Sequence, residues 1–304
     1  MAADPNDGER LYHATELGHA DGLRLLLRHG ADPKGTNALA RALYFDNAEM
    51  VGLLLDGNAN PNEGADAAAT NTISRCGIPA LHQAALRMNS GAVLDLLLEG
   101  GADANASWHG HSAYAFAAVF GNADLIARLD ALGHVTPLTD MEQMLAQAAK
   151  GHVGDGFIDT DKLPAQYRGI LRKILHLPDK LAHLKALVAI GLEWDHADGD
   201  GVTPVQAAGW NGLPDVMGYF MTLRPDLSHV NTHGGTLLST ILHGADHNPQ
   251  RAGGDYIGCL RIAMEHGVAL PRRAIETSGS LEIRAFLQQW AERMPGQVVE
   301  HGIF

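Results

Sequence analysis

The chain is short of basic residues and of cysteine. Its 304 residues include 22 Lys and Arg against 35 Asp and Glu, which gives a formal net charge of −13. Nucleic-acid binding draws most of its affinity from Lys and Arg contacts with phosphates, so this balance argues against a nucleic-acid partner. The two cysteines, Cys76 and Cys259, lie far apart and outside any CxxC motif. They indicate a reducing compartment and provide neither a disulfide framework nor a zinc knuckle.

Long apolar runs and catalytic motifs are missing as well. No stretch approaches the ~18 uninterrupted apolar residues that a membrane-spanning helix needs, so no membrane contact is expected. The opening MAADPNDGERLYHA has no basic head followed by an apolar run. This is unlike a secretory signal, and a cytoplasmic location is expected. No GxxxxGK[ST], GxSxG or HExxH motif occurs, so nothing predicts a nucleotide enzyme or a bound cofactor.

What the sequence does contain is a recurring phrase. Residues 198–212 read DGDGVTPVQAAGWNG, with an apolar anchor at Val205, a glycine four residues before it and another seven residues after it. The same frame fits other anchors, and most are followed by a second apolar stretch such as LRLLLRHGAD or LDLLLEGGAD. The anchors Leu81 and Tyr114 are 33 residues apart. A fixed period of this length is typical of stacked repeats, so the phrase is interpreted as architecture.

The pattern resembles the ankyrin repeat, whose phrase D-x-x-G-x-T-P-L-H-x-A-A-x-x-G-H is matched by DGDGVTPVQAAGWNG and IPALHQAA. The resemblance implies an all-α solenoid of about seven helix-pair repeats with a capping half-repeat at about 271–294, all in one domain over 1–304. The wide spacing of 61 residues between the anchors at 144 and 205 predicts an insertion at about 152–178 in repeat five. A second insertion, at about 245–254, is expected between the two helices of repeat seven. The second insertion, HGADHNPQRAGGDY, resembles a late loop of a group of bacterial ankyrin proteins.

The first insertion contains an amphipathic segment. Over residues 163–177, LPAQYRGILRKILHL, apolar side chains recur at helical spacing. These apolar residues are Leu163, Tyr167, Ile170, Leu171, Ile174 and Leu175. The spacing predicts an additional helix. Extra loops on a rigid scaffold often carry function, so both insertions are candidates to extend or cap a groove.

The 17 histidines invite a metal hypothesis. His82 stands at the T-P-L-H position, where the resemblance implies that it ties the turn together by hydrogen bonds. The segment DHADGDG at 195–201 lacks the spaced ligands and terminal Glu of a calcium-binding EF-hand loop, and it is interpreted as the turn of the next repeat.

One histidine cluster leaves a metal site open. His243, Asp246 and His247 would share one side of a continuing helix, and two His with a carboxylate are reasonable ligands for zinc or iron. Gly244 and the pair Asn248–Pro249 indicate instead that the helix has ended. Polar hydrogen bonding is the favoured interpretation, ahead of a metal-free ligand or catalytic role and of a metal site.

In the ankyrin family the two positions before the trailing glycine face a concave groove, which the turn tips flank. Several of these positions hold large apolar side chains that folding does not need there, and exposed apolar residues usually mark binding sites. The predicted contact residues are Tyr44, Phe45, Trp108, His109, His111, Phe120, Trp210, His233 and His243. Other groove or tip positions include Leu17, Arg75, Cys76, Arg87 and Val119. Burial of the groove stripe inside the molecule is the alternative.

The resemblance most directly implies a non-catalytic module that binds a partner protein through the groove and the turn tips. The acidic balance would suit a basic partner. The alternative is a small-molecule-binding protein or an atypical enzyme, with a groove site where the aromatics meet the turn histidines. A purely structural spacer is a third hypothesis, and it is disfavoured because a spacer gains nothing from exposed aromatics.

Overall fold

The computed structural model describes residues 4–6, 9–66 and 77–300. The chain divides into two compact units, residues 1–156 and 157–304, and the division falls inside the first expected insertion. We call them unit 1 and unit 2 and describe each by itself. The described residues are mostly helical, as the resemblance implies. Among them, no helix combines the length and the apolar character that crossing a bilayer requires.

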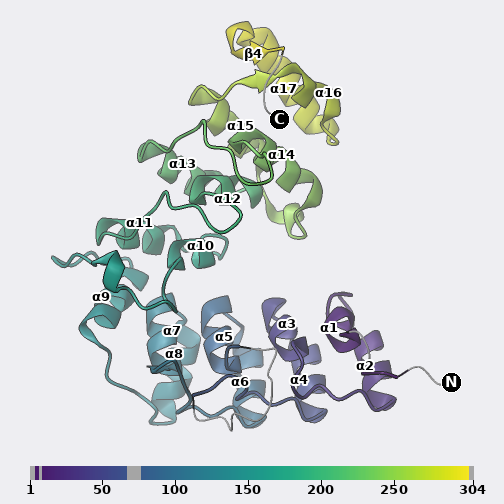
Figure 1. Ribbon diagram of the computed structural model, residues 1–304, viewed down its shortest axis with the longest axis vertical. Helices are drawn as coiled ribbons and strands as arrows, with labels where there is room; N and C mark the ends of the chain where they lie inside the picture. The colour runs from purple at the N-terminus through teal and green to yellow at the C-terminus, as the bar shows by residue number, and fades with distance from the viewer. Residues whose placement is uncertain (1–3, 7–8, 67–76, 301–304) are drawn as a thin grey trace. The chain divides into compact units, whose positions relative to one another are not determined.

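Unit 1 is built from helix pairs in two rows (Figure 1). Its described helices are α1 (Arg10–Ala14), α2 (Asp21–Arg28), α3 (Ala38–Tyr44), α4 (Ala48–Asp56), α5 (Ala80–Arg87), α6 (Gly91–Glu99), α7 (Ala113–Phe120), α8 (Ala123–Ala131) and α9 (Asp140–Ala149). The first helices α1, α3, α5 and α7 pack side by side in chain order, and α9 packs against α7. The second helices α2, α4, α6 and α8 form the other row.

Small apolar residues let the first helices approach one another closely. The pairs Ala84–Ala85 and Ala117–Ala118 are buried, where α5 packs against α7. Along α7, whose sequence is AYAFAAVF, seven of the eight residues are buried. One helix pair could not cover so much apolar surface, which is why the pairs stack into a continuous core.

The turn between the two helices of a pair keeps a left-handed residue. After α7 it is Gly121, with φ +74°. After α3 it is Asp46, with φ +51°, and after α5 it is Met88, with φ +56°. Glycine adopts this conformation freely, whereas a side chain makes it less favourable by about 1–2 kcal/mol. The geometry of the repeat is therefore kept even where the glycine is replaced.

Buried asparagines link successive helix pairs in unit 1. Asn122, which caps the start of α8, also donates a hydrogen bond to the Ala84 carbonyl at 3.2 Å. Asn89 donates to the Leu43 carbonyl at 2.8 Å and to the Asp46 carboxylate at 2.9 Å. Buried carbonyls need such partners, so these two side chains fix the spacing between neighbouring repeats.

Unit 2 continues with helices and a few short elements. Its described helices are α10 (Ile170–Ile174), α11 (Leu181–Ala189), α12 (Pro204–Trp210), α13 (Pro214–Thr222), α14 (Leu237–His247), α15 (Tyr256–Glu265), α16 (Arg272–Thr277) and α17 (Leu281–Arg293). Helix α12 packs against α10, α13 and α14, and α15 packs against α14 and α17. Thr203 and Thr236 start α12 and α14 with capping boxes, and Pro204 is the first helical residue of α12. The strands β3 (Leu270–Pro271) and β4 (Val298–Val299) pair in parallel.

The helix predicted over residues 163–177 forms only in part. Helix α10 spans Ile170–Ile174, because Gly169 has φ +66° and interrupts any helix that starts earlier. The apolar side chains predicted for its inner face are nevertheless buried, namely Leu163, Tyr167, Ile170, Leu171, Ile174 and Leu175. The apolar spacing therefore indicated burial correctly and the helix length wrongly.

The expected end of a helix near Gly244 is also wrong. Helix α14 continues to His247, and Asn248 follows it as the C-terminal cap. A Cβ atom on Gly244 would lie 2.3 Å from the Trp210 carbonyl oxygen, so this glycine serves the close approach of α14 to the end of α12. Asn248 donates a hydrogen bond to the same carbonyl at 2.9 Å. The chain then passes through η2 (Arg251–Gly253) into α15.

Candidate functional site

The predicted tip residues of unit 1 lie on a small hairpin. Strands β1 (Ser107–Trp108) and β2 (His111–Ser112) pair in antiparallel register. The Asp66 carboxylate accepts hydrogen bonds from the backbone N–H groups of His109 and Gly110, at 2.7 and 2.8 Å. The bond from Gly110 is the largest cause that lowers the pKa of the Asp66 carboxyl below its ordinary value, and the bond from His109 is the next. The hairpin is thus anchored by a residue of the preceding turn.

His111 is engaged inside the scaffold. Its Nδ1 lies 2.8 Å from a Glu142 carboxylate oxygen, and the two side chains are 15% and 5% exposed. Its backbone oxygen lies 3.0 Å from His82 Nε2, so His82 ties the turn together as the resemblance implies. Desolvation lowers the pKa of His82 from 6.5 to about 4. His111 and His82 therefore contribute to folding more directly than to contact with a partner.

The other two tip residues differ in exposure. Trp108 is half-buried and packs edge-on against His82 and Phe116, with ring centroids 6.4 and 5.5 Å apart. His109 is exposed and has φ +50°. Among the described tip residues Trp108, His109 and His111, His109 alone is exposed to solvent.

Phe120 does not lie on the surface. Its ring is fully buried and stacks on Phe116 at a centroid distance of 5.6 Å, in the helix against which α9 packs. Val119 is fully buried as well. The prediction of an exposed contact at Phe120 is therefore wrong, and the alternative of internal burial holds for this part of the stripe. Phe120 cannot line a ligand site at the surface.

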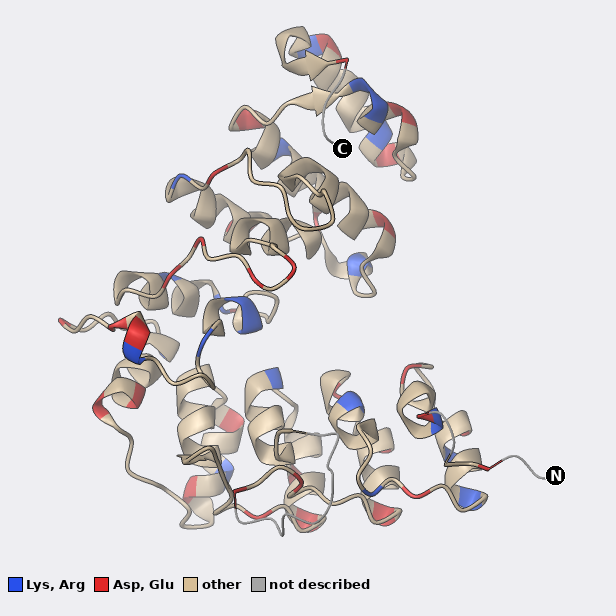
Figure 2. Ribbon diagram, in the orientation of Figure 1, with Lys and Arg blue, Asp and Glu red and all other residues tan. Residues whose placement is uncertain are grey.

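Tyr44 and Phe45 have the exposure that the sequence predicts. Each is 40% exposed, and their rings meet edge to face with centroids 5.1 Å apart. Two guanidinium groups lie over them. The Arg41 guanidinium carbon is 4.9 Å from the Tyr44 ring centroid and 4.7 Å from that of Phe45, and the Arg87 carbon is 4.4 Å from the Tyr44 centroid. We call Tyr12, Arg41, Tyr44, Phe45 and Arg87 the aromatic–arginine cluster; Figure 2 shows basic residues on both α3 and α5.

The two arginines of this cluster differ in their partners. Arg41 forms an ion pair with Glu16 at 2.8 Å, and Glu16 also lies 3.0 Å from His13 Nδ1. The hydrogen bond with His13 is the largest cause that lowers the pKa of Glu16 below its ordinary value, and the hydrogen bond with Arg41 lowers it further. Arg87 has no ion pair with any described residue. The Nε atoms of both arginines are buried and have no hydrogen-bond partner among the described residues, so the ion pair is what distinguishes them. The spare positive charge of the cluster therefore belongs to Arg87.

Unit 2 contains a wide groove of about 930 Å³. It is lined by α10, the turns at 202 and 231–235, α12, α14 and α16. Three predicted residues lie together in it, Trp210, His233 and His243. The Trp210 and His243 rings have centroids 5.3 Å apart. Trp210 is half-buried, whereas His233 and His243 are exposed, so the groove is open to solvent.

The proposed ligand set of His243, Asp246 and His247 does lie on one helix, because α14 continues to His247. The rings of His243 and His247 have centroids 4.4 Å apart, and all three side chains are exposed. In the part of the chain that the structure describes, no group of three or more His, Cys, Asp or Glu side chains is placed to hold a metal ion. Cys259 is buried, and desolvation raises the pKa of its thiol to about 12.

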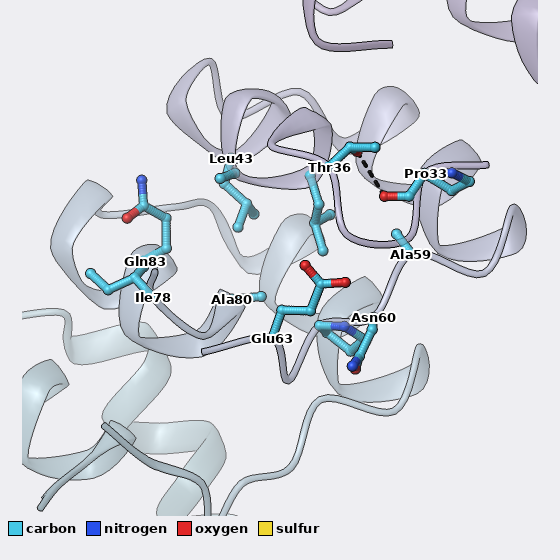
Figure 3. A pocket seen from close by; sticks show the side chains of 12 residues that line it. Pro33, Thr36, Leu43, Ala59, Asn60, Glu63, Ile78, Ala80 and Gln83 are labelled. Atoms are coloured by element: carbon cyan, nitrogen blue, oxygen red, sulfur yellow. Dashed lines mark hydrogen bonds between the residues drawn. The ribbon is translucent and has the colours of Figure 1, made fainter. Parts of the chain in front are cut away.

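Figure 3 shows a much smaller hollow in unit 1, between α3 and the turns that follow α2 and α4. Its volume is about 10 Å³, room for about one water molecule. Glu63 projects into it, and its carboxylate accepts a hydrogen bond from the Gly35 N–H at 2.7 Å. This hollow belongs to the packing between repeats and has no room for a ligand.

The sequence interpretation missed the role of the arginines. Arg87 was one of the expected groove positions, but its stacking on Tyr44 joins side chains from two different repeats. Arg41 precedes Phe45 by four residues, so one helix face could have suggested that contact. Arg75 and Cys76 lie outside the described residues.

Comparison with known proteins finds an ankyrin repeat in one part of the chain. The family model of the ankyrin repeat matches residues 76–108, the region of α5 and α6. No curated protein matches the chain. Similar solved structures include the human ASB11 ankyrin repeat domain, with 17% identity and a TM-score of 0.39 over 83% of this chain and 96% of that one. Another is the ankyrin repeat domain of Bcl-3, an IkappaB family member, with 17% identity and a TM-score of 0.38 over 77% of this chain and 94% of that one.

Proposed function

We propose, from the premise that the chain carries an ankyrin repeat at residues 76–108, that it is a protein-interaction module whose partner binds the aromatic–arginine cluster of unit 1. Ankyrin repeats are generally protein-interaction modules. The observation that carries the proposal is the exposure of two adjacent aromatic rings, Tyr44 and Phe45, each 40% exposed. Leu17, at the corresponding position after α1, is 57% exposed.

The energetics of protein interfaces support this choice of surface. Trp, Tyr and Arg side chains are enriched among interface hot spots. Aromatic rings bury a large area at a small cost in side-chain entropy. Here the guanidinium groups of Arg41 and Arg87 hold the Tyr44 ring between repeats. A surface ordered before binding loses less conformational entropy when a partner docks.

Site-specific photocrosslinking in cells that naturally make the protein tests the proposal. A photoreactive phenylalanine analogue at position 45 is expected to capture a protein partner, and Tyr44→Ala in the same chain is expected to reduce the yield at least tenfold. Phe157, which is 75% exposed and lies in unit 2, is the control position. The proposal is wrong if position 45 gives no more protein adduct than position 157.

The groove of unit 2 supports a second candidate, a small-molecule site. Its volume of about 930 Å³ lies within the range of ligand pockets. Trp210, His233 and His243 supply an aromatic wall and polar groups, and an atypical enzyme would use the same groove. Native mass spectrometry of the purified chain tests this: a bound small molecule should be lost in Trp210→Ala and kept in Phe45→Ala. Absence of any such adduct contradicts the candidate.

A further inference from the structure

Arg87 is a cation in an unusual position for a surface arginine. It is half-buried at the C-terminal end of α5, and its guanidinium lies over the Tyr44 ring. Its Nε is shielded from solvent and has no hydrogen-bond acceptor among the described residues. Burial is also the largest influence on the pKa of its guanidinium, which it lowers below the ordinary value. The Nε atom has therefore lost its water, and no described residue forms an ion pair with the guanidinium in return.

The carboxylates of the turns after α1 and α3 have other partners. Glu16 is bound by Arg41 and His13. Asp46 accepts hydrogen bonds from the Asn89 side chain and from the Ser90 N–H, both at 2.9 Å, and from the Ser90 hydroxyl at 3.1 Å. Arg41 is a like charge near Arg87 and opposes its ionisation further. No carboxylate of the described residues is among the groups that shift the pKa of Arg87.

A partially buried charge is unfavourable unless it is paired, and a guanidinium is paired best by a carboxylate. The positive charge at Arg87 lies over the part-exposed Tyr44 ring, and the part-exposed Phe45 ring contacts Tyr44 in turn. An occupant that fits both features carries a carboxylate beside an apolar side chain. This local preference for an acidic group is the opposite of the preference for basic molecules that the chain's net charge of −13 creates at a distance.

We propose that Arg87 is a carboxylate-binding residue and that the partner presents an Asp or Glu side chain next to an aromatic or large aliphatic one. The carboxylate pairs with the Arg87 guanidinium, and the apolar neighbour packs on Tyr44 and Phe45. The proposal rests on the proposed function, because it names the chemistry of the partner at the same surface. A nucleic acid is a poor occupant, because it needs several cations along its phosphates and this cluster has one cation to spare.

Selection from a random 12-residue peptide library, displayed on phage and panned against the full chain, tests the proposal. Selected peptides are expected to share an Asp or Glu within three positions of a Phe, Tyr, Trp or Leu. Panning against Arg87→Gln, which removes the charge and keeps hydrogen-bonding groups, is expected to lose that acidic preference. Arg24→Gln is the matched control: it removes one charge from the second row of helices, where Arg24 pairs with Glu49.

Calorimetry with one selected peptide then gives the size of the effect. Arg87→Gln is expected to weaken binding at least about tenfold, as does replacing the acidic residue of the peptide, because each change removes one partner of a partly buried ion pair. The two changes together should cost little more than either alone. Arg87→Lys should fall between wild type and Arg87→Gln, because lysine keeps the charge without the planar fork. Thermal unfolding of each variant confirms that it is folded.

The outcomes separate this inference from the function on which it rests. If Tyr44→Ala and Phe45→Ala abolish binding while Arg87→Gln leaves it unchanged, the interaction surface stands and the carboxylate proposal is wrong. Selection of basic peptides, or of no peptide above background, also overturns it. If the two aromatic variants bind as tightly as wild type, the surface itself has been misplaced and both proposals fall.

Discussion

Helices α3 and α7 occupy corresponding places in unit 1, and a phenylalanine stands directly before the left-handed turn residue in each case. The ring of Phe45 at the end of α3 is 40% exposed, whereas that of Phe120 at the end of α7 is fully buried. The residue four positions earlier differs: Phe116 stacks on Phe120, and Arg41 lays its guanidinium over Phe45. Since side chains at i and i+4 share one helix face, that partner helps to decide whether the aromatic ring joins the core or the surface.

The largest effect should come from removing these two rings. Phe120→Ala is expected to lower the free energy of unfolding of unit 1 by about 3–5 kcal/mol, because it leaves a cavity in the core. Phe45→Ala is expected to lower it by less than about 1 kcal/mol, because the ring is exposed and loses mainly its contact with Arg41. Hydrogen exchange of the slowest amides in α5 and α7 measures both values. Equal losses would remove the distinction between the two helix ends.

The next effect is a loss of stability at low pH, which follows from the burial of His82 against α7. His82 contacts Phe116, and its pKa is about 4 in the folded chain against 6.5 ordinarily. Between these values the unfolded chain binds more protons, so the stability that neutral His82 preserves is lost as the pH falls from 6.5 toward 4. At about 1.4 kcal/mol per pH unit, the loss reaches about 3 kcal/mol.

The variant His82→Gln checks this assignment, because glutamine does not titrate. The corresponding residue of α3 is Ala40, so this pH dependence should belong to the α5–α7 region. The difference in unfolding free energy between wild type and His82→Gln should change with pH between 6.5 and 4 and stay constant below pH 4. A difference that is independent of pH would contradict the burial of a neutral His82.

The smallest effect compares the asparagines that begin the second helices. Asn122 caps α8 and also bonds Ala84 of the preceding repeat, whereas Asn47 caps α4 through the Met50 N–H. Asn122→Ala is expected to lower the free energy of unfolding by about 2 kcal/mol and Asn47→Ala by about 1 kcal/mol, because the first change also leaves a buried carbonyl unpaired. Urea denaturation measures both, and a larger loss for Asn47→Ala would show that the link between repeats contributes nothing.

The features of the fold and of the site that the sequence predicts are those whose contacts join residues close together in the chain. The glycine and alanine pattern predicted the helix pairs, because each pair is encoded within one short phrase. The pattern showed that Phe45 and Phe120 occupy equivalent positions, but it did not predict that one is exposed and the other buried. The residues that make the difference, Arg41 and Phe116, stand four positions earlier in each helix. The position of His111 at a turn tip predicted a contact residue, and no local pattern could show its partner Glu142, which lies 31 residues further along. The same reason hid the contact of Arg87 with Tyr44.

Amide hydrogen exchange of the full chain, with and without a saturating selected peptide, tests most directly whether a partner binds the aromatic–arginine cluster. Slower exchange is predicted at the ends of α3 and α5, in residues 40–47 and 83–90, with unit 2 unchanged. Protection confined to the groove around Trp210, with none at the ends of α3 and α5, would contradict the account.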